Sequence, residues 1–143
     1  MKKSKMPESR ESNAVVAIVD DDPSVRRGPA RLIRSVGWRV EAFSSAQEFL
    51  DRPGTETVSC LVLDLQLGDL NGLDLQKRLA EAGLATPIIF LTGHGDIPTT
   101  AQAMKAGAIE FLTKPVDEED LLKAIQEAIE TRPANAAAAG GQA

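Results

Sequence analysis

Side chains that bind soft transition metals are scarce in this 143-residue sequence, which has one cysteine, Cys60, and one histidine, His94. A zinc-like site needs several such ligands, so the sequence disfavours one. A single cysteine also excludes an internal disulfide, and its place in an apolar run is typical of a buried structural thiol. Carboxylates are the plentiful ligands that remain, and they suit hard cations such as magnesium.

Long apolar runs and an excess of positive charge are also missing. No run approaches the roughly 20 apolar residues that a membrane helix requires. The formal net charge of −5 argues against non-specific binding to nucleic acid or anionic membranes, since both need clustered lysine and arginine. Residues 1–5 are basic, but no apolar segment follows them, so they indicate a tail rather than a signal peptide.

The length suits one domain with one core. We expect a disordered tail over residues 1–13, a single domain over 14–131, and an Ala/Gly-rich linker or tail over 132–143. Within the domain, five apolar segments alternate with five helical patterns. Strands are expected at residues 15–19, 39–43, 60–64, 87–91 and 108–112. Helices are expected from Pro23 to Gly37, Ser45 to about Arg52, around Leu75 to Ala82, Pro98 to about Gly107, and Asp117 to just before Arg132.

Particular residues modify these helices. Asp22 is expected to cap the first helix, and Ser45 with Glu48 has the form of a capping box. Pro29 falls inside the first helix, where the missing backbone hydrogen bond predicts a kink or a local weakening. The fourth helix contains one large apolar residue, Met104, so we expect it to be weakly anchored and mobile.

Strict strand–helix alternation predicts an α/β fold with a parallel sheet. Strands 15–19, 60–64 and 87–91 are continuously apolar and should be central, whereas strands 39–43 and 108–112 carry interior charge and should form the edges. With right-handed crossovers, the simplest arrangement is a flavodoxin-like (βα)5 doubly wound sheet. Numbered along the chain, its strands lie in the order 2-1-3-4-5.

The charged residues collect at one edge of this predicted sheet. Strands one and three meet at the topological switch point, where such sheets bind ligands, and their carboxyl ends carry Asp20, Asp21 and Asp64. Strands four and five bring Thr92 and Lys114 to the same edge. Three clustered carboxylates repel one another unless cations neutralise them, and Mg²⁺ together with the Lys114 ammonium would do so.

This arrangement suits phosphoryl transfer, which depends mostly on positioning and charge neutralisation. Asp64 would attack phosphorus, the metal and Lys114 would hold the phosphoryl oxygens, and Thr92 would donate a hydrogen bond. Each residue alone has an ordinary explanation as a solvated strand end, a helix cap or a turn residue. Their coincidence on one edge favours a common function.

The same residues resemble the receiver domains of bacterial two-component response regulators over residues 14–131. The signature comprises Val19-Asp20-Asp21, the apolar run that ends in Asp64, Leu91-Thr92 and Lys114-Pro115. Residues 91–98 and 104–108 further resemble the nitrogen-fixation-type transcriptional regulators. In those regulators the receiver usually precedes a helix-turn-helix DNA-binding domain.

The resemblance implies that Asp64 accepts a phosphoryl group from the phosphohistidine of a sensor histidine kinase. It implies that Asp21, Asp64 and the backbone carbonyl of Gln66 hold Mg²⁺, with Asp20 acting partly through water. The domain would not be an enzyme, beyond promoting its own phosphorylation and dephosphorylation. Gln66 and His94 match positions that tune the lifetime of the acyl phosphate, although a plain loop role for His94 is equally open.

The resemblance also implies a phosphorylation switch. Thr92 would move onto the phosphoryl group and Phe111 would rotate inward, although an ordinary strand aromatic is an open alternative for Phe111. The surface of helix 4, strand 5 and helix 5 would then change for homodimerisation or partner docking. The expected result is control of a DNA-binding output domain outside this chain, in the cytoplasm, without direct nucleic-acid or membrane binding. A stand-alone receiver that acts by protein–protein docking is the alternative.

Two local departures from the family pattern affect these expectations. Gly68-Asp69 stands where the family usually has Pro followed by Gly. The loop after Asp64 is therefore expected to be more flexible and more acidic, and Asp69 could disturb metal binding or the approach of a kinase. Pro29 replaces an expected aliphatic residue, which concerns the first helix rather than the site.

Two other functions fit part of the pattern. A magnesium-dependent phosphatase of the haloacid-dehalogenase type would use Asp20 as its nucleophile, but needs an acidic pair after the fourth strand and commonly a cap domain. A flavodoxin-like mononucleotide binder would need Ser, Thr and Gly amides after the first strand and aromatics around a flavin. Here that loop is acidic, and the chain has no tyrosine and one tryptophan, Trp38.

Overall fold

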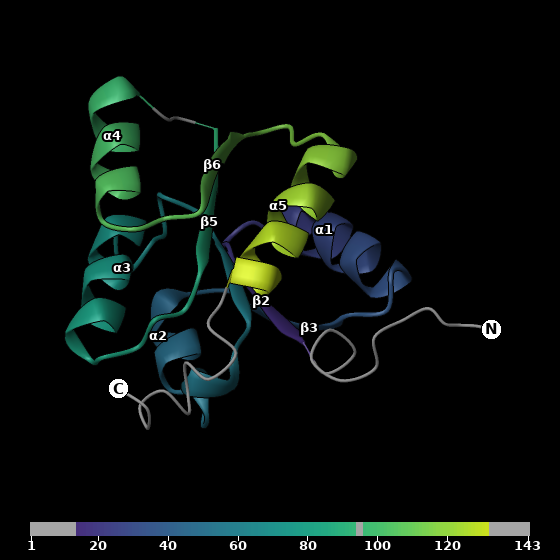
Figure 1. Ribbon diagram of the computed structural model, residues 1–143, viewed down its shortest axis with the longest axis horizontal. Coiled ribbons are helices and arrows are strands. Elements are labelled where there is room, and N and C mark those ends of the chain that lie inside the picture. The colour runs from purple at the N-terminus through teal and green to yellow at the C-terminus, as the bar shows by residue number, and fades with distance from the viewer. Residues whose placement is uncertain (1–13, 94–95, 132–143) are drawn as a thin grey trace.

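The computed structural model describes residues 14–93 and 96–131. The tails predicted at residues 1–13 and 132–143, and the loop residue His94, lie outside the described residues. The strands, labelled as in Figure 1, are β2 (Val15–Val19), β3 (Arg39–Phe43), β4 (Cys60–Leu63), β5 (Ile88–Thr92) and β6 (Glu110–Thr113). The helices are α1 (Pro23–Ser35), α2 (Ala46–Leu50), the 3₁₀ turn η1 (Thr55–Thr57), α3 (Gly72–Glu81), α4 (Ile97–Lys105) and α5 (Glu118–Thr131).

The five strands form one parallel sheet in the order β3-β2-β4-β5-β6. This confirms the predicted order 2-1-3-4-5 and the flavodoxin-like fold. The three inner strands are buried along their whole length, whereas β3 and β6 are partly exposed, as their interior charges predicted. Three strands differ at their boundaries. β4 ends one residue earlier than predicted, at Leu63, and β5 lies one residue later. β6 begins two residues later, at Glu110, and ends one residue later.

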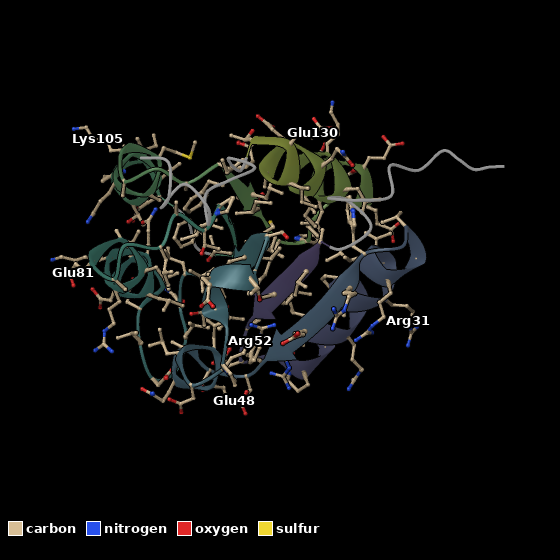
Figure 2. All side chains as sticks on the ribbon, turned by 60° about the horizontal axis from the view of Figure 1, so that its bottom comes forward. Arg31, Glu48, Arg52, Glu81, Lys105 and Glu130 are labelled. Atoms are coloured by element: carbon tan, nitrogen blue, oxygen red, sulfur yellow. The ribbon has the colours of Figure 1, made fainter. Side chains whose placement is uncertain are left out.

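Helices cover both faces of the sheet. Figure 1 shows α2, α3 and α4 on one side and α1 and α5 on the other, and a separate apolar core fills each side. Charged side chains such as Arg31, Glu81 and Glu130 point away from these cores (Figure 2). Cys60 lies in the core beneath α1 and α5 with no exposed surface, and burial raises the pKa of its thiol.

The helix starts follow the capping chemistry of the sequence. The Asp22 carboxylate accepts hydrogen bonds from both the backbone N–H and the hydroxyl of Ser24 (3.0 and 2.8 Å), which confirms it as the cap of α1. Ser45 caps α2 by accepting from Glu48 N at 3.1 Å. The Glu48 carboxylate reaches Ser44 N, at 2.7 Å, so the capping box is completed one residue earlier than the predicted Ser45.

The first helix runs unbroken through Pro29, from Pro23 to Ser35. Pro29 has no N–H to donate to the Val25 carbonyl, so the predicted local weakening stays a prediction rather than a visible break. Trp38 packs against the core on the α1–α5 side of the sheet. None of the helices in the described ranges is long and apolar enough to cross a membrane.

Candidate functional site

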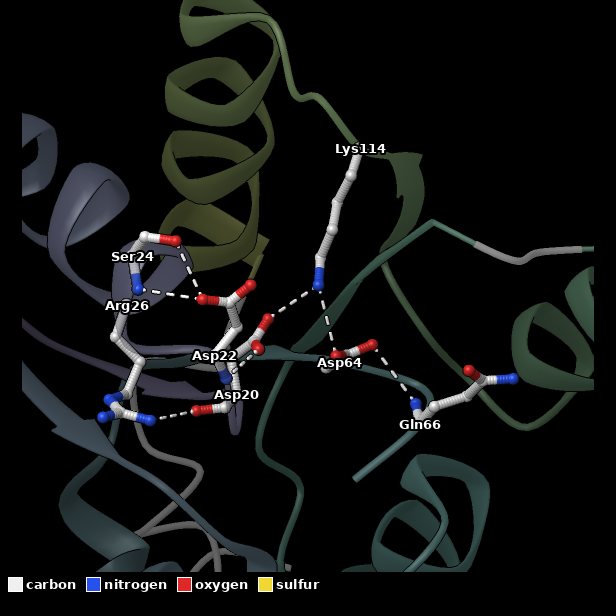
Figure 3. Close-up of polar contacts among 7 residues, drawn as sticks. All are labelled: Asp20, Asp22, Ser24, Arg26, Asp64, Gln66 and Lys114. Carbon is white, nitrogen blue, oxygen red and sulfur yellow. Dashed lines mark hydrogen bonds and ion pairs between the residues drawn. The ribbon is translucent and has the colours of Figure 1, made fainter. Parts of the chain in front are cut away.

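A lysine bridges two buried carboxylates at one edge of the sheet. Lys114 Nζ donates to Asp20 Oδ2 at 2.9 Å and to Asp64 Oδ2 at 3.2 Å (Figure 3). Asp20 is 1% exposed and Asp64 is 7% exposed. Two carboxylates this deeply buried need a counter-charge, and the Lys114 ammonium supplies it.

The sheet register brings these residues together. Val19 pairs with Leu63 at the ends of β2 and β4, so Asp20 and Asp64 follow neighbouring strand ends. Lys114 comes directly after β6, where its backbone N–H donates to the Thr92 carbonyl of β5 at 2.9 Å. Its peptide bond to Pro115 is cis. The side chains of Asp20, Asp64 and Lys114 therefore meet at the carboxyl ends of the strands, as the strand order predicted.

The surroundings of Asp20 include an arginine that the sequence did not single out. Asp20 Oδ1 accepts from Asp22 N at 2.9 Å, so both of its carboxylate oxygens are hydrogen-bonded. Arg26, on α1, donates from Nη1 to the Asp20 backbone carbonyl at 2.7 Å (Figure 3). A signal was present in the sequence, because Arg26 falls in the first turn of a helix whose cap, Asp22, lies two residues after Asp20.

The surroundings of the site raise the pKa values of both Asp64 and Lys114, but for different reasons. Burial raises the pKa of Asp64, and the neighbouring Asp20 charge adds to that effect against the lowering hydrogen bonds from Gln66 and Lys114. Burial acts against the charged form of Lys114, but the hydrogen bonds and charges of Asp20 and Asp64 together outweigh it, so the pKa of Lys114 is raised. Lys114 is therefore held in its charged form beside Asp64.

Three carboxylates lie close enough to share a cation. Asp20, Asp21 and Asp64 each offer an oxygen within 4.8 Å of the others, and Asp21 is the exposed member. An all-oxygen donor set with an exposed side fits a hard cation that keeps some of its water, such as Mg²⁺. Gln66 N donates to Asp64 Oδ1 at 3.2 Å, while the Gln66 carbonyl as a metal ligand stays a prediction.

The two predicted switch residues lie on β5 and β6. Thr92 ends β5 and is 1% exposed, next to the strand that delivers Lys114. Phe111 is half-buried and packs on the α2–α3–α4 side, with its ring centroid 5.7 Å from that of Phe90. His94 lies outside the described residues.

The loop that follows Asp64 differs from what its composition predicted. Asp69 does not join the acidic cluster; its carboxylate accepts hydrogen bonds from the first N–H groups of α2. At Gly72 a Cβ would lie 2.6 Å from the Asp64 carbonyl oxygen, so only glycine fits where α3 begins. The sequence reasoning missed both roles, although Asp69 has the side chain expected of a helix cap.

An apolar pocket adjoins the site. It has a volume of about 400 Å³ and lies between α1 and the turn that leads into α5. Its lining includes Val25, Pro29, Leu91, Pro115 and Val116, and Lys114 borders it. Pro29, which departs from the expected aliphatic residue, therefore forms part of a surface beside the candidate phosphoacceptor.

Comparison with known families gives one match over most of the chain. Residues 16–126 match the family described as the response regulator receiver domain. Among curated relatives, the response regulator protein TmoT of Ectopseudomonas mendocina is 50% identical over 123 residues, covering 86% of this chain and 56% of TmoT. FixJ of Bradyrhizobium diazoefficiens is 38% identical over 114 residues, covering 80% of this chain and 56% of FixJ.

Solved structures give the same family. The response regulator StyR superposes with a TM-score of 0.83 at 45% identity, covering 91% of this chain and 66% of that one. The structure titled FixJ-N superposes with a TM-score of 0.76 at 35% identity, covering 85% of this chain and 98% of that one. The chain spans about half the length of the curated relatives it matches.

Proposed function

The chain belongs to the response regulator receiver domains, and from this premise we propose that it is a phosphorylation switch whose phosphoacceptor is Asp64. Such domains are phosphorylated by sensor histidine kinases, and we take a kinase of that class as the donor. The observation that carries the proposal is the Lys114 ammonium between the carboxylates of Asp20 and Asp64, at the switch point of a parallel sheet.

The proposed step is a transfer of phosphoryl from phosphohistidine to Asp64. A carboxylate oxygen of Asp64 forms the new bond to phosphorus, the phosphorus–nitrogen bond breaks, and its electron pair returns to the imidazole. Lys114, already 3.2 Å from Asp64, is placed to hold a phosphoryl oxygen and offset its charge. We propose that Thr92, buried at the end of β5, donates a hydrogen bond to another phosphoryl oxygen.

Receiver domains bind Mg²⁺ through acidic residues, and this chain has such a cluster. We propose that Asp21, Asp64 and the Gln66 carbonyl hold the ion, with Asp20 acting partly through water. When bound, Mg²⁺ would supply charge neutralisation for the carboxylates and the incoming phosphoryl oxygens. Gln66 and His94 are proposed to tune the lifetime of the acyl phosphate.

The readout is proposed to be the surface of α4, β6 and α5. Phe111 packs on the sheet face that α4 covers and would rotate inward as Thr92 moves. This surface would then serve homodimerisation or control of a DNA-binding output domain, since relatives such as FixJ are named transcriptional regulators. Residues 14–131 would form the receiver, in the cytoplasm, with no catalysis beyond its own phosphorylation and dephosphorylation.

Incubation with acetyl phosphate and Mg²⁺, followed by intact mass, tests the proposal. The wild-type chain should gain one phosphate, and Asp64→Asn should gain none. Asp74→Asn, which neutralises an exposed carboxylate in the first turn of α3, is the matched control and should behave as wild type. A phosphate that persists in Asp64→Asn but disappears in Asp20→Asn would instead favour the phosphatase chemistry with Asp20 as nucleophile.

A further inference from the structure

The loop from Asp64 to Gly72 is closed at its base by its own hydrogen bonds. Gln66 N donates to Asp64 Oδ1 at 3.2 Å, and Gly72 N donates to the Leu65 carbonyl at 2.7 Å. Gln66 and Asn71 also pair as an isolated antiparallel bridge. These contacts fix the base of the loop, and they leave the position of its tip, residues 67–70, to other interactions.

Asp69 connects this tip to α2, a helix that lies earlier in the chain. Its Oδ1 accepts from Ala46 N at 3.3 Å, and its Oδ2 accepts from Gln47 N at 3.1 Å. These are the first two N–H groups of α2, which have no acceptor within the helix. The third, Glu48 N, is taken by Ser45 Oγ. Two different side chains therefore cap α2, and of these two only Asp69 belongs to the phosphoacceptor loop.

The tip lies beside the acidic cluster. A Cβ at Gly68 would be 3.8 Å from Asp21 Oδ2, so the backbone at Gly68 passes close to the exposed carboxylate of the cluster. Glycine has more backbone freedom than any other residue, so this stretch is not rigid by itself. Leu67 and Leu70 pack against the core on the α2 side of the sheet, and the Asp69 tether further restricts the backbone next to Gly68.

The charge of Asp69 is also directed away from the cluster. Burial is the largest single influence on the pKa of Asp69 and raises it, but the backbone hydrogen bonds, led by those from Gln47 and Ala46, together outweigh it, so the pKa is lowered. A carboxylate at a helix N-terminus is stabilised by the exposed N–H groups there. The extra acidic residue in this loop therefore serves α2 rather than adding a fourth repelling charge to the cluster.

We propose that Asp69 is a positioning residue for Mg²⁺ binding and phosphoryl transfer. By tying the loop tip to α2, it holds the backbone beside Asp21 and Asp64 in the arrangement that the site requires. The inference rests on the proposed function, because the site it supports is the proposed phosphorylation site. Coupling of this kind is reciprocal, so Mg²⁺ binding must in turn strengthen the tether at Ala46 and Gln47.

The test is a Mg²⁺ titration by calorimetry on the wild-type chain, Asp69→Ala and two controls. Ser45→Ala removes the other cap of α2 and leaves the loop untouched. Asp74→Ala removes a nearby exposed negative charge that accepts none of the hydrogen bonds described above. Loss of the tether should weaken Mg²⁺ binding about fivefold in Asp69→Ala, as expected for one or two hydrogen bonds. Both controls should stay within about twofold of wild type.

Asp69→Asn serves as the milder variant should Asp69→Ala unfold, because the asparagine amide keeps one acceptor oxygen. It should bind Mg²⁺ with an intermediate affinity. Amide hydrogen exchange of the wild-type chain gives an independent readout: Mg²⁺ should slow exchange at Ala46 and Gln47 more than at Glu48, which Ser45 holds.

Equal weakening in Asp69→Ala and Ser45→Ala would overturn the inference, because the effect would then come from α2 stability alone. Equal weakening in Asp69→Ala and Asp74→Ala would overturn it in favour of net charge. Unchanged exchange at Ala46 and Gln47 would also contradict it. A wild-type chain that gains no phosphate from acetyl phosphate would refute the proposed function instead, whatever the Asp69 variants do.

Discussion

Helices α4 and α5 flank the same edge strand, β6, on opposite sides of the sheet, but they are held very differently. Five α5 side chains are buried: Leu121, Ala124, Ile125, Ala128 and Ile129. In α4 only Ala103 is buried, whereas Ile97 is 85% exposed and Met104 is 39% exposed. The large apolar residue that the sequence offered as an anchor for α4, Met104, is therefore not the one that packs.

This difference separates a helix that belongs to the core from one that rests on it. Burial of apolar surface is the main stabilising term in folding, so α5 cannot leave the sheet without a large loss of stability. The position of α4 depends on one small side chain and on a hydrogen bond from Gln76 Nε2, on α3, to the Ala103 carbonyl at 3.1 Å. An element held this weakly can shift at low cost, which a switch requires.

The largest expected effect comes from cutting the core contact of α5. Ile125→Ala should lower the free energy of unfolding by about 2–5 kcal/mol, because it leaves a cavity at a fully buried position. Ile97→Ala on α4 is the matched control and should change it by less than about 0.5 kcal/mol. Urea unfolding followed by Trp38 fluorescence measures both. Similar losses in the two variants would show that α4 is as firmly packed as α5.

A smaller effect is expected at the hydrogen bond that holds α4. Gln76→Leu should cost about 1 kcal/mol, because the Ala103 carbonyl keeps its second donor, Ala108 N at 3.1 Å. Amide exchange should accelerate in α4 and stay unchanged in α5. Gln126→Leu, which removes a surface amide bonded to Glu130, is the control. Exchange that accelerates throughout the chain would mean that Gln76 supports the whole fold rather than α4.

The smallest effect concerns the charge at the start of α4. Asp96 Oδ1 accepts from Thr99 N at 2.8 Å, and hydrogen bonding with Thr99 lowers the pKa of Asp96 below its usual 3.8. A lowered folded-state pKa adds stability above 3.8 that is lost as the pH falls through the folded-state value. Because asparagine caps helices as well as aspartate does, Asp96→Asn isolates this charge. The wild-type chain should be slightly more stable than the variant at pH 7, and this difference should shrink as the pH falls below 3.8. A difference that persists at the lower pH would assign it to shape rather than charge.

The sheet was predictable because its signals are strong and local. Continuous apolar runs identified β2, β4 and β5 as central, and interior charges identified β3 and β6 as edges. Strand order then fixed which carboxyl ends meet, so the juxtaposition of Asp20, Asp64 and Lys114 followed from topology. Helix caps at Asp22 and Ser45 were predictable for the same local reason.

Two contacts made by single side chains away from the strand-end convergence were not predicted. Asp69 looked like a fourth charge beside the metal ligands, but it caps a helix that begins 23 residues earlier. Arg26 looked like an ordinary helix arginine, yet it holds the Asp20 carbonyl. Strand boundaries near β5 and β6 also shifted by one or two residues, since apolar content alone does not fix where pairing begins.

The burial of Cys60 has a practical consequence for measuring how α4 moves. A thiol without exposed surface and with a raised pKa reacts slowly with maleimide or other thiol reagents in the folded chain. Cys60 therefore takes up little label, and it does not have to be replaced at the cost of a core contact. A cysteine introduced in place of the exposed Ile97 would accept a spectroscopic label selectively, so the position of α4 can be followed directly during phosphorylation.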